Sequence, residues 1–291
     1  MPPGRRPTVY HAILALRLNA TPGAVQAAQA VAPGCALGRW REMEGGRTNR
    51  VWRVRRRSGS TVTVKEYARA ATPLFRNDPR AELAALRHLR GTGLAPHPLG
   101  LSDHGGLPVL VYEHVESHGP AEPEDTARAL ARLHATPPPR TLRPMPDLGA
   151  LLANMLPTLW DPPEVLRVPR PPPAAEPPGA FVHGDPTPGN ALATPGGCVL
   201  IDWQCPAVGD PCWDLGMLVS PAMRRLDGLP PLSRDRTTAV LDAYGSPETV
   251  GRLAGLLPTI RALLAAHCLW RAQRGWPGAA EAAAAEIAAM G

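Results

Sequence analysis

The segment from residue 181 to 215 contains the polar residues whose types and spacing are best suited to chemistry. It reads FVHGDPTPGNALATPGGCVLIDWQCPAVGDPCWDL. An apolar strand leads to His183 and Asp185, Asn190 follows five residues later, and Asp202 ends a second apolar strand twelve residues further on. Phosphoryl transfer needs a carboxylate that accepts a proton from the attacking hydroxyl, and amide and carboxylate oxygens that hold Mg²⁺. Asp185, Asn190 and Asp202 supply those three groups.

A second candidate residue is Lys65, the only lysine among the 31 basic residues of the chain. In the run TVTVK, alternation places Val62 and Val64 on one face of a strand and Lys65 on the other. An ammonium is a compact point charge, whereas a guanidinium is planar and has a different reach, so the two are not equivalent beside phosphates. The helix predicted at 79–90 carries Glu82 on its buried face, and a buried carboxylate normally requires a partner. Chance alone would explain one exposed lysine, and only the surrounding motifs favour a nucleotide-binding role.

The elements expected before residue 115 are a small sheet and one helix. From residue 37 onward, strand-like runs separated by the turns GGRTN and SGS predict an antiparallel meander that ends with TVTVKEYA. A helix over 79–90 and a strand over 107–115 follow. The later part is mainly helical, with helices predicted at 123–136, near 147–160 and at the carboxy-terminal end.

The composition is that of a folded protein without an obvious covalent framework. A chain of 291 residues that is 44% hydrophobic is long enough for two domains with their own cores. The five cysteines are odd in number and contain no C-x-x-C pair, which indicates neither a disulfide framework nor a zinc site. Because no run approaches the ~18 apolar residues of a membrane span, and Arg17 interrupts the amino-terminal apolar run, we expect a cytoplasmic protein.

The charge is distributed unevenly along the chain. Residues 1–114 carry a net charge of +10 and residues 115–291 a net charge of −4, within a total of +6. The first part therefore suits an anion, and the second is mildly suited to a cation. The run RVRRRSGS at 53–60 is of a kind that binds phosphate backbones, but the exposed edge of a hairpin is the favoured explanation. We expect neither a nucleic-acid nor a membrane partner, and the oligomeric state is left open.

The motifs occur in the order found in protein kinases. H-x-D-x4-N is followed by a strand-terminal aspartate, with DWQ in place of the usual D-F-G, and a turn with two glycines, a strand lysine and a helix glutamate precede them. The signatures HGDxxxxN, IDW and GDPxxDL, at 183–190, 201–203 and 209–215, resemble those of the aminoglycoside phosphotransferase and choline kinase superfamily of small-molecule kinases. The resemblance covers about residues 37 to 275 and is closer to the choline and ethanolamine kinase branch.

This resemblance implies an α+β, two-lobed, protein-kinase-like fold with ATP in the cleft. Residues 37–114 would form the nucleotide-binding N-lobe, a small antiparallel sheet with one main helix. Residues 115–291 would form a larger, mainly helical C-lobe that carries the catalytic loop and the metal and substrate sites. Residues 1–36 would be an N-terminal extension, and GAVQAAQAVAP within it is compatible with a helix.

The resemblance also implies roles for single residues. Asp185 would be the catalytic base, and Asn190 would complete the catalytic loop. Asn190 and Asp202 would be the ligands of Mg²⁺. Lys65 would bind the phosphates of ATP and pair with Glu82.

Further residues are implied to hold the nucleotide or to support the loop. Those at the nucleotide are Gly45, Gly46, Thr48, Asn49, Glu113 and His114. Thr48 and Asn49 could give hydroxyl and amide donors to phosphate, with turn formation as the alternative, and the backbone at Glu113 and His114 would hold adenine. His183 and Asp214 are expected to be scaffold residues that orient the catalytic loop and tie its backbone.

The acceptor is predicted from weaker features. The turn GGRTNRVWRV is closer to the GGxTNxxxxV turn of bacterial choline, ethanolamine and thiamine kinase relatives, and AAHCLWRAQ at 265–273 is similar to the helix that lines the choline pocket. Aromatic faces bind quaternary ammonium groups. The candidate aromatics are Trp203 and Trp270, then Trp213 and Trp276, with core packing as the alternative for each.

The leading hypothesis is an ATP- and Mg²⁺-dependent kinase that phosphorylates the hydroxyl of a small, cationic alcohol such as choline or ethanolamine. The first alternative is an aminoglycoside or other antibiotic kinase. An alternative of another class is a catalytically silent nucleotide-binding regulatory module.

Overall fold

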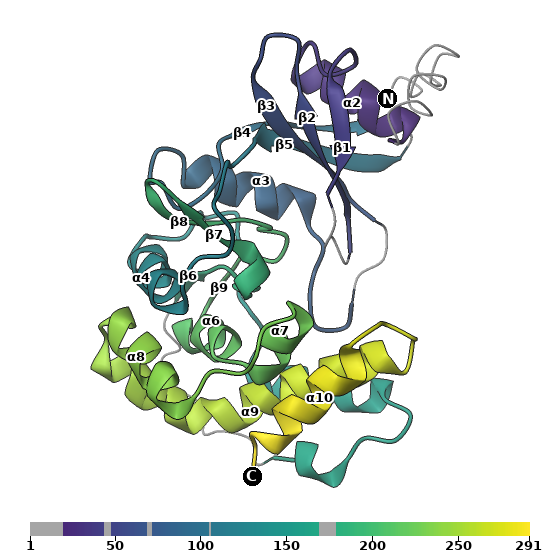
Figure 1. The fold of residues 1–291 in the computed structure, drawn as a ribbon. Coiled ribbons are helices and arrows are strands. Elements are labelled where there is room, and N and C mark those ends of the chain that lie inside the picture. The colour runs from purple at the N-terminus through teal and green to yellow at the C-terminus, as the bar shows by residue number, and fades with distance from the viewer. Residues whose placement is uncertain (1–19, 44–47, 69–71, 105, 169–178) are drawn as a thin grey trace. The chain divides into compact units, whose positions relative to one another are not determined.

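The chain folds into two compact units (Figure 1). The structure is a computed structural model that describes residues 20–43, 48–68, 72–104, 106–168 and 179–291. The first unit comprises Met1–Thr72 and Arg76–Glu116, and the second comprises Pro73–Phe75 and Ser117–Gly291. The division after Glu116 lies two residues beyond the boundary expected from the sequence.

The first unit is built on a five-stranded antiparallel sheet with the strand order β1-β2-β3-β5-β4. Its strands are β1 (Arg39–Glu42), β2 (Arg50–Arg55), β3 (Thr61–Glu66), β4 (Pro98–His104) and β5 (Leu107–Glu113). The strand β4 was not predicted from the sequence, because PLGLSDH shows no regular alternation of apolar residues. It forms by pairing with β5, and its register shifts between Pro98 and Gly100.

The described residues of the first unit include two helices, each started by a polar side chain. The helix α2 (Pro22–Val31) follows Thr21, whose hydroxyl accepts from a first-turn N–H group. The helix α3 (Pro79–His88) follows Asp78, whose carboxylate accepts from two such groups. These side chains satisfy N–H groups that have no partner inside the helix, and a proline at the start lacks that N–H altogether.

The two faces of β3 have different surroundings. Val62 and Val64 are fully buried in a core that also contains residues of β2, β5 and α2, among them Trp52, Val54, Val109, Val111, Ala24, Ala27 and Ala28. Lys65 is directed to the opposite face, where its ammonium contacts Glu82 of α3. The alternation in TVTVK therefore separates an apolar core from a polar site.

The second unit is mainly helical. Its α-helices are α4 (Pro123–His134), α5 (Leu148–Met155), α6 (Pro211–Leu218), α7 (Pro221–Leu226), α8 (Arg234–Tyr244), α9 (Pro247–Ala272) and α10 (Ala279–Ala288). Short 3-10 turns are η1 (Leu156–Thr158), η2 (Glu164–Leu166) and η3 (Pro188–Asn190). Two small antiparallel pairs carry the motif residues, β6 (Ala180–Val182) with β9 (Ala207–Gly209), and β7 (Ala191–Thr194) with β8 (Gly197–Leu200).

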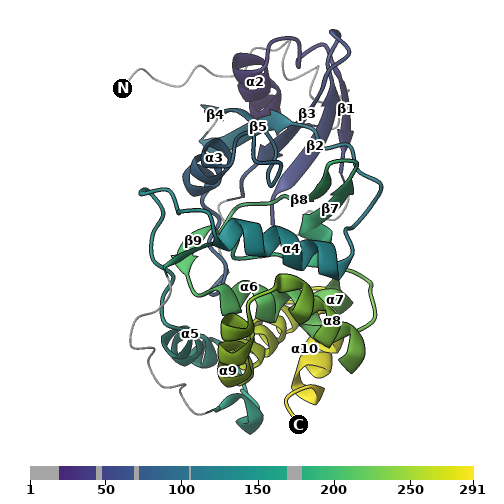
Figure 2. The ribbon, with the colours of Figure 1, turned by 90° about the vertical axis from the view of Figure 1, so that its left-hand side faces the viewer.

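The helix α9 is longer and more apolar than the sequence analysis recognised. Among the described residues it is the one helix that could cross a membrane by length and composition, with a mean hydropathy of 1.4 in its most apolar window. Of that window 56% is buried inside the protein, and the helix contacts α5, α6 and α10 (Figure 2). Its apolar residues therefore form the core of the second unit.

The close contact between α6 and α9 predicts opposite effects of two glycine-to-alanine substitutions. A Cβ added at Gly216 would lie 2.7 Å from Cγ2 of Ile260, whereas nothing lies within 4 Å of a Cβ at Gly251. Gly216→Ala should lower the free energy of unfolding by about 1–3 kcal/mol through overpacking. Gly251→Ala, in an exposed turn of α9, should raise it by about 0.5–1 kcal/mol because alanine loses less conformational freedom. Urea denaturation of both variants tests this, and a stabilised Gly216→Ala would contradict the packing.

Candidate active site

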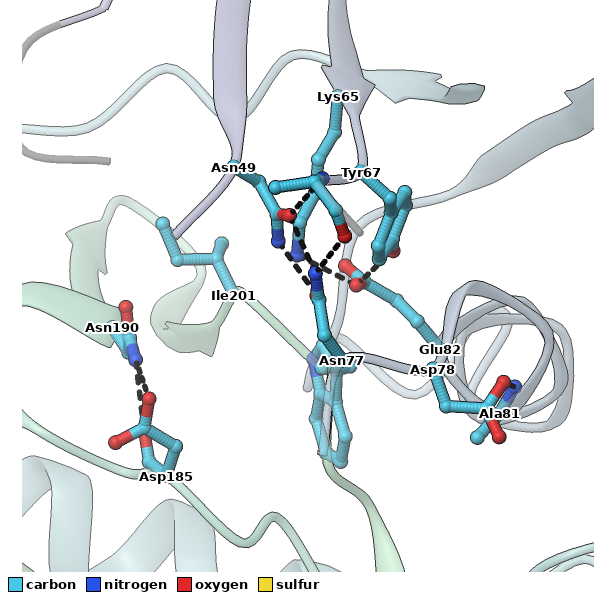
Figure 3. A network of polar contacts seen from close by, with 12 residues as sticks. Asn49, Lys65, Tyr67, Asn77, Asp78, Ala81, Glu82, Asp185, Asn190 and Ile201 are labelled. Atoms are coloured by element: carbon cyan, nitrogen blue, oxygen red, sulfur yellow. Dashed lines mark hydrogen bonds and ion pairs between the residues drawn. The ribbon is translucent and has the colours of Figure 1, made fainter. Parts of the chain in front are cut away.

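The first unit contains a buried ion pair between β3 and α3 (Figure 3). Nζ of Lys65 lies 2.6 Å from Oε2 of Glu82, and both side chains are at most 2% exposed. The hydroxyl of Tyr67 donates to the same carboxylate oxygen, and Nζ lies 5.0 Å from the centroid of the Tyr67 ring. The carboxylate therefore fixes the position of the ammonium, and the ring limits its surroundings. Tyr67 was missed in the sequence, although it continues the alternation of Thr63 and Lys65.

The backbone predicted to hold adenine is partly engaged within the first unit. The N–H of Glu113 donates to the carbonyl of His97 at 2.9 Å, and the N–H of His114 donates to Thr61 at 3.2 Å. Nδ1 of His114 also lies 2.9 Å from Oγ1 of Thr63. Burial, and then the charge of Arg53, lower the pKa of His114. An adenine ring at this position would therefore bind to carbonyl groups or to later N–H groups.

The predicted phosphate turn is only partly described. Gly45 and Gly46 lie outside the described residues, and Thr48 is half-buried. The side-chain amide of Asn49 forms two hydrogen bonds with that of Asn77, at 2.8 and 2.9 Å, and accepts from the N–H of Ala68 at 3.0 Å (Figure 3). These contacts give Asn49 a structural role, since it joins the turn before β2 to the chain that follows β3.

The second unit carries the catalytic loop, which we define as residues 183–190. Nδ2 of Asn190 donates to the backbone carbonyl of Asp185 at 2.9 Å and lies 3.3 Å from its Oδ2 (Figure 3). The N–H of Asn190 donates to Thr187, and the N–H of Thr187 donates to Asp185. The loop is therefore a tight turn, and the amide nitrogen of Asn190 is directed at the aspartate. This orientation leaves the amide oxygen as the group that could bind a metal ion.

Two backbone positions around the loop have left-handed conformations. Gly184 has φ +87°, and a Cβ there would lie 2.2 Å from the carbonyl oxygen of Cys205, so only glycine fits. Asp202 has φ 62° and is the one non-glycine residue with positive φ in the described ranges. A left-handed backbone is uncommon for residues other than glycine, and the exceptions often lie at functional sites. The left-handed backbone at Asp202, a residue that the sequence motifs had already marked as a candidate metal ligand, was not predicted from the sequence.

The carboxylate of Asp214 holds the beginning of the loop. It is fully buried and accepts from the N–H groups of His183 and Gly184, at 2.7 and 2.9 Å. Nε2 of His134, on α4, lies 3.0 Å from the same carboxylate, and its Nδ1 lies 2.9 Å from the hydroxyl of Tyr244. The polar partners of His134 were not predicted from the sequence.

The ring of His183 connects the loop to the second motif strand. Nδ1 accepts from the N–H of Asp185 at 3.2 Å, and Nε2 lies 3.0 Å from the carbonyl of Ile201. Because a carbonyl can only accept, Nε2 carries the proton. His183 and Asp214 therefore act on the backbone of the catalytic loop.

Comparison with known proteins identifies the family of the chain. The model of the phosphotransferase enzyme family, abbreviated APH, matches residues 39–256. The chain belongs to this family. The search of curated proteins found no match.

Solved structures of other family members share the fold of this phosphotransferase. A choline/ethanolamine kinase family protein from Mesorhizobium loti is 18% identical, with a TM-score of 0.60 and 86% of each chain covered. A macrolide 2′-phosphotransferase from Brachybacterium faecium is 18% identical, with a TM-score of 0.55, over 85% of this chain and 91% of that one. An amicoumacin kinase in complex with AMP-PNP and Ca²⁺ is 14% identical, with a TM-score of 0.51, over 80% and 79%. The likeness confirms the predicted protein-kinase-like fold. That the chain is a phosphotransferase enzyme follows from the family model.

Trp203 of the phosphotransferase is a core residue. Its ring is fully buried, and its N–H donates to the carbonyl of Leu200 at 2.8 Å. The ring centroids of Phe181 and His183 lie 5.7 and 4.3 Å away. Trp203 thus supports the ring of His183, and this placement favours the packing alternative over the predicted substrate contact. Trp213 is also buried, and its N–H donates to the carbonyl of Gly184.

The tryptophans near the end of α9 already contact arginine. The guanidinium of Arg274 lies 4.1 Å from the ring centroid of Trp270, and that of Arg271 lies 4.8 Å from the ring of Trp276. The ring of His267 stacks with Trp270, and burial, together with the charge of Arg271, holds the pKa of His267 well below its ordinary value. A cationic substrate at Trp270 would have to compete with a guanidinium, so this site is not the open cation-binding face that the sequence suggested.

Asn190 of the catalytic loop and Asp202, which follows β8, have side chains that fit a magnesium ion also held by a nucleotide. Asn190 can present its amide oxygen and Asp202 a carboxylate, both hard oxygen ligands. The described parts of the chain contain no group of three or more His, Cys, Asp or Glu side chains that could hold a metal ion alone. Mg²⁺ usually has one or two protein ligands and completes its shell with phosphates and water.

The buried ion pair predicts that Glu82→Gln is strongly destabilising. The amide still accepts from Tyr67, but the buried ammonium of Lys65 loses the counter-charge of Glu82. Loss of one partner of such a pair costs about 3–5 kcal/mol. In the matched double variant, Lys65→Met with Glu82→Gln, neither charge of the pair is left, and much of that loss should be recovered. Urea denaturation without nucleotide measures both variants, and equal destabilisation would show that charge is not the cause.

Proposed function

We propose that this phosphotransferase is an ATP- and Mg²⁺-dependent kinase that phosphorylates a hydroxyl of a small-molecule alcohol. The observation that carries the proposal is the catalytic loop, in which Asn190 holds Asp185 through two hydrogen-bond contacts. A related solved structure, the amicoumacin kinase, contains AMP-PNP and Ca²⁺, which supports a nucleotide and a divalent cation here.

Each of the candidate site residues has a separate role in the proposed reaction. Asp185 accepts the proton of the acceptor hydroxyl while the oxygen of that hydroxyl attacks the terminal phosphorus of ATP. The bond from this phosphorus to the ADP oxygen breaks on the opposite side, and ADP leaves. Lys65, kept in place by Glu82, offsets negative charge on the phosphates. Asn190 and Asp202 are the residues that would hold the metal. When bound, Mg²⁺ would supply positive charge that offsets the negative charge developing on the phosphates.

The acceptor is proposed only by class. A choline- or ethanolamine-like cation is supported by the net charge of −4 over residues 115–291 and by the likeness to a choline/ethanolamine kinase family protein. The arginines over Trp270 and Trp276 oppose it, because they remove the aromatic faces on which that hypothesis depended. A larger antibiotic acceptor is supported in the same limited way by the likeness to a macrolide 2′-phosphotransferase.

A panel of acceptors tests the proposal. Purified protein with labelled ATP and Mg²⁺ should transfer phosphate to at least one alcohol among choline, ethanolamine, thiamine, a fructosamine, aminoglycosides and macrolides. Asp185→Ala should lower turnover by about 10²–10⁴-fold, the usual contribution of a general base, while ATP still binds. Transfer to antibiotics alone would exclude the choline-like acceptor. A wild type that binds ATP but phosphorylates nothing in a wide panel would support the silent regulatory module.

The burial of Lys65 predicts that even arginine cannot replace it. Its ammonium lies between Glu82 and Tyr67, and a longer, planar guanidinium cannot take the same position. Lys65→Arg should therefore lower turnover by about 10²-fold, as small displacements of a charge at a reacting phosphate do. Arg55→Lys, at an exposed position of β2, is the matched control and should be normal. Near-normal turnover of Lys65→Arg would show that the identity of this residue is unimportant.

A further inference from the structure

The catalytic loop has one contact with a distant carboxylate that no sequence motif accounts for. The N–H of Gly189, next to the metal-binding candidate Asn190, donates to Oδ2 of Asp227 at 2.8 Å. Asp227 lies 38 residues later, at the end of α7. A Cβ at Gly189 would be 3.3–3.4 Å from the carboxylate atoms of Asp227, so loop and carboxylate fit closely.

The turn that follows α7 fixes the position of Asp227. The N–H of Gly228 donates to Arg225, and the N–H of Leu229 donates to Arg224, with Gly228 at φ +74°. This is the pattern of a Schellman turn, in which a left-handed glycine ends the helix and satisfies its last carbonyls. Arg224 also donates from Nε to the carbonyl of Pro230 at 2.8 Å. The carboxylate therefore projects from a well-defined helix end.

The opposite end of α7 is fixed as well. Glu286 of α10 is fully buried, and its Oε2 accepts from the hydroxyl of Ser220 and from the N–H of Ala222, the latter at 2.9 Å. A carboxylate at a helix N-terminus satisfies free N–H groups and interacts favourably with the helix dipole. With both ends fixed, α7 is a rigid support for Asp227.

We propose that Asp227 is a positioning residue of the phosphotransfer reaction. Its carboxylate holds the N–H of Gly189 and thereby sets the place of Asn190, whose side chain in turn holds Asp185. A charged acceptor makes this hydrogen bond stronger than a backbone carbonyl would. The inference rests on the proposed function, because it concerns the loop that carries the proposed base and metal ligand.

Three variants separate this role from a general effect of charge or stability. Asp227→Ala removes the acceptor, and Asp227→Asn keeps an oxygen that can accept the same hydrogen bond. Asp242→Ala removes an exposed carboxylate from α8 and is the matched control for charge. If Asp227→Ala does not fold, Gly189→Ala disturbs the same contact from the side of the loop.

The readouts are turnover, the affinity for Mn²⁺ in the presence of AMP-PNP, and hydrogen exchange of a peptide that spans the catalytic loop. We expect Asp227→Ala to lower kcat and weaken Mn²⁺ binding by about 10-fold each, as loss of a supporting contact to a metal ligand does. Loop exchange should become faster, and KM for ATP should stay within about twofold. Asp227→Asn keeps the acceptor oxygen without the charge, so its losses should be smaller than those of Asp227→Ala. Asp242→Ala should resemble the wild type.

Two results have distinct meanings. If Mn²⁺ affinity and loop exchange in Asp227→Ala equal those of the wild type, the inference is overturned, whatever happens to turnover. If the wild type neither binds Mn²⁺ with AMP-PNP nor transfers phosphate, the proposed function fails. Loop exchange would then test only the contact between Asp227 and the loop, because faster exchange in Asp227→Ala would support that contact and unchanged exchange would reject it.

Discussion

The buried carboxylate of Asp214 is the constraint on which the second unit's catalytic loop depends. It satisfies two consecutive N–H groups, those of His183 and Gly184, where water has no access. Leaving either group unpaired would cost about 1–3 kcal/mol. Two bonds from one carboxylate fix the direction in which the chain leaves β6, and the left-handed Gly184 then turns it so that Asp185 is presented. The ring of His134 contacts the same carboxylate, and the hydroxyl of Tyr244 contacts the other nitrogen of that ring, so the two residues orient Asp214.

The same interaction, a side-chain oxygen that accepts hydrogen bonds from backbone N–H groups without a helical partner, recurs at the first turns of the helices. Side-chain oxygens cap α2, α3, α5, α6, α7, α8 and α9, and a proline occupies the first turn of α2, α3, α4, α6, α7 and α9. This explains part of the high proline content, since proline costs no hydrogen bond at the first helical position. These six helix-start prolines, of 37 in the chain, are therefore compatible with a helical protein.

The sequence predicted most elements that have a strong local pattern. The alternation of β3, the helical spacing of α3 and the strand-loop-strand of the motif segment were all readable because near neighbours determine them. The strand β4 was not, since PLGLSDH becomes a strand only by pairing with β5. The length and burial of α9 were also missed, because Pro258 and two glycines, Gly251 and Gly255, obscure a helix that its neighbours stabilise.

For the candidate site, the sequence by itself determined which groups are present: one lysine, one helix glutamate, and the ordered set Asp185, Asn190 and Asp202. Only the tertiary structure decided how they are held. Tyr67 shares the carboxylate with Lys65, and Asp227 meets the loop from 38 residues away. The tertiary structure also showed that Trp203 is packed in the core and that an arginine contacts Trp270. The physical reason is that motif spacing reports chemistry along the chain, whereas a hydrogen-bond partner or a covered ring face is set by burial among residues distant in sequence.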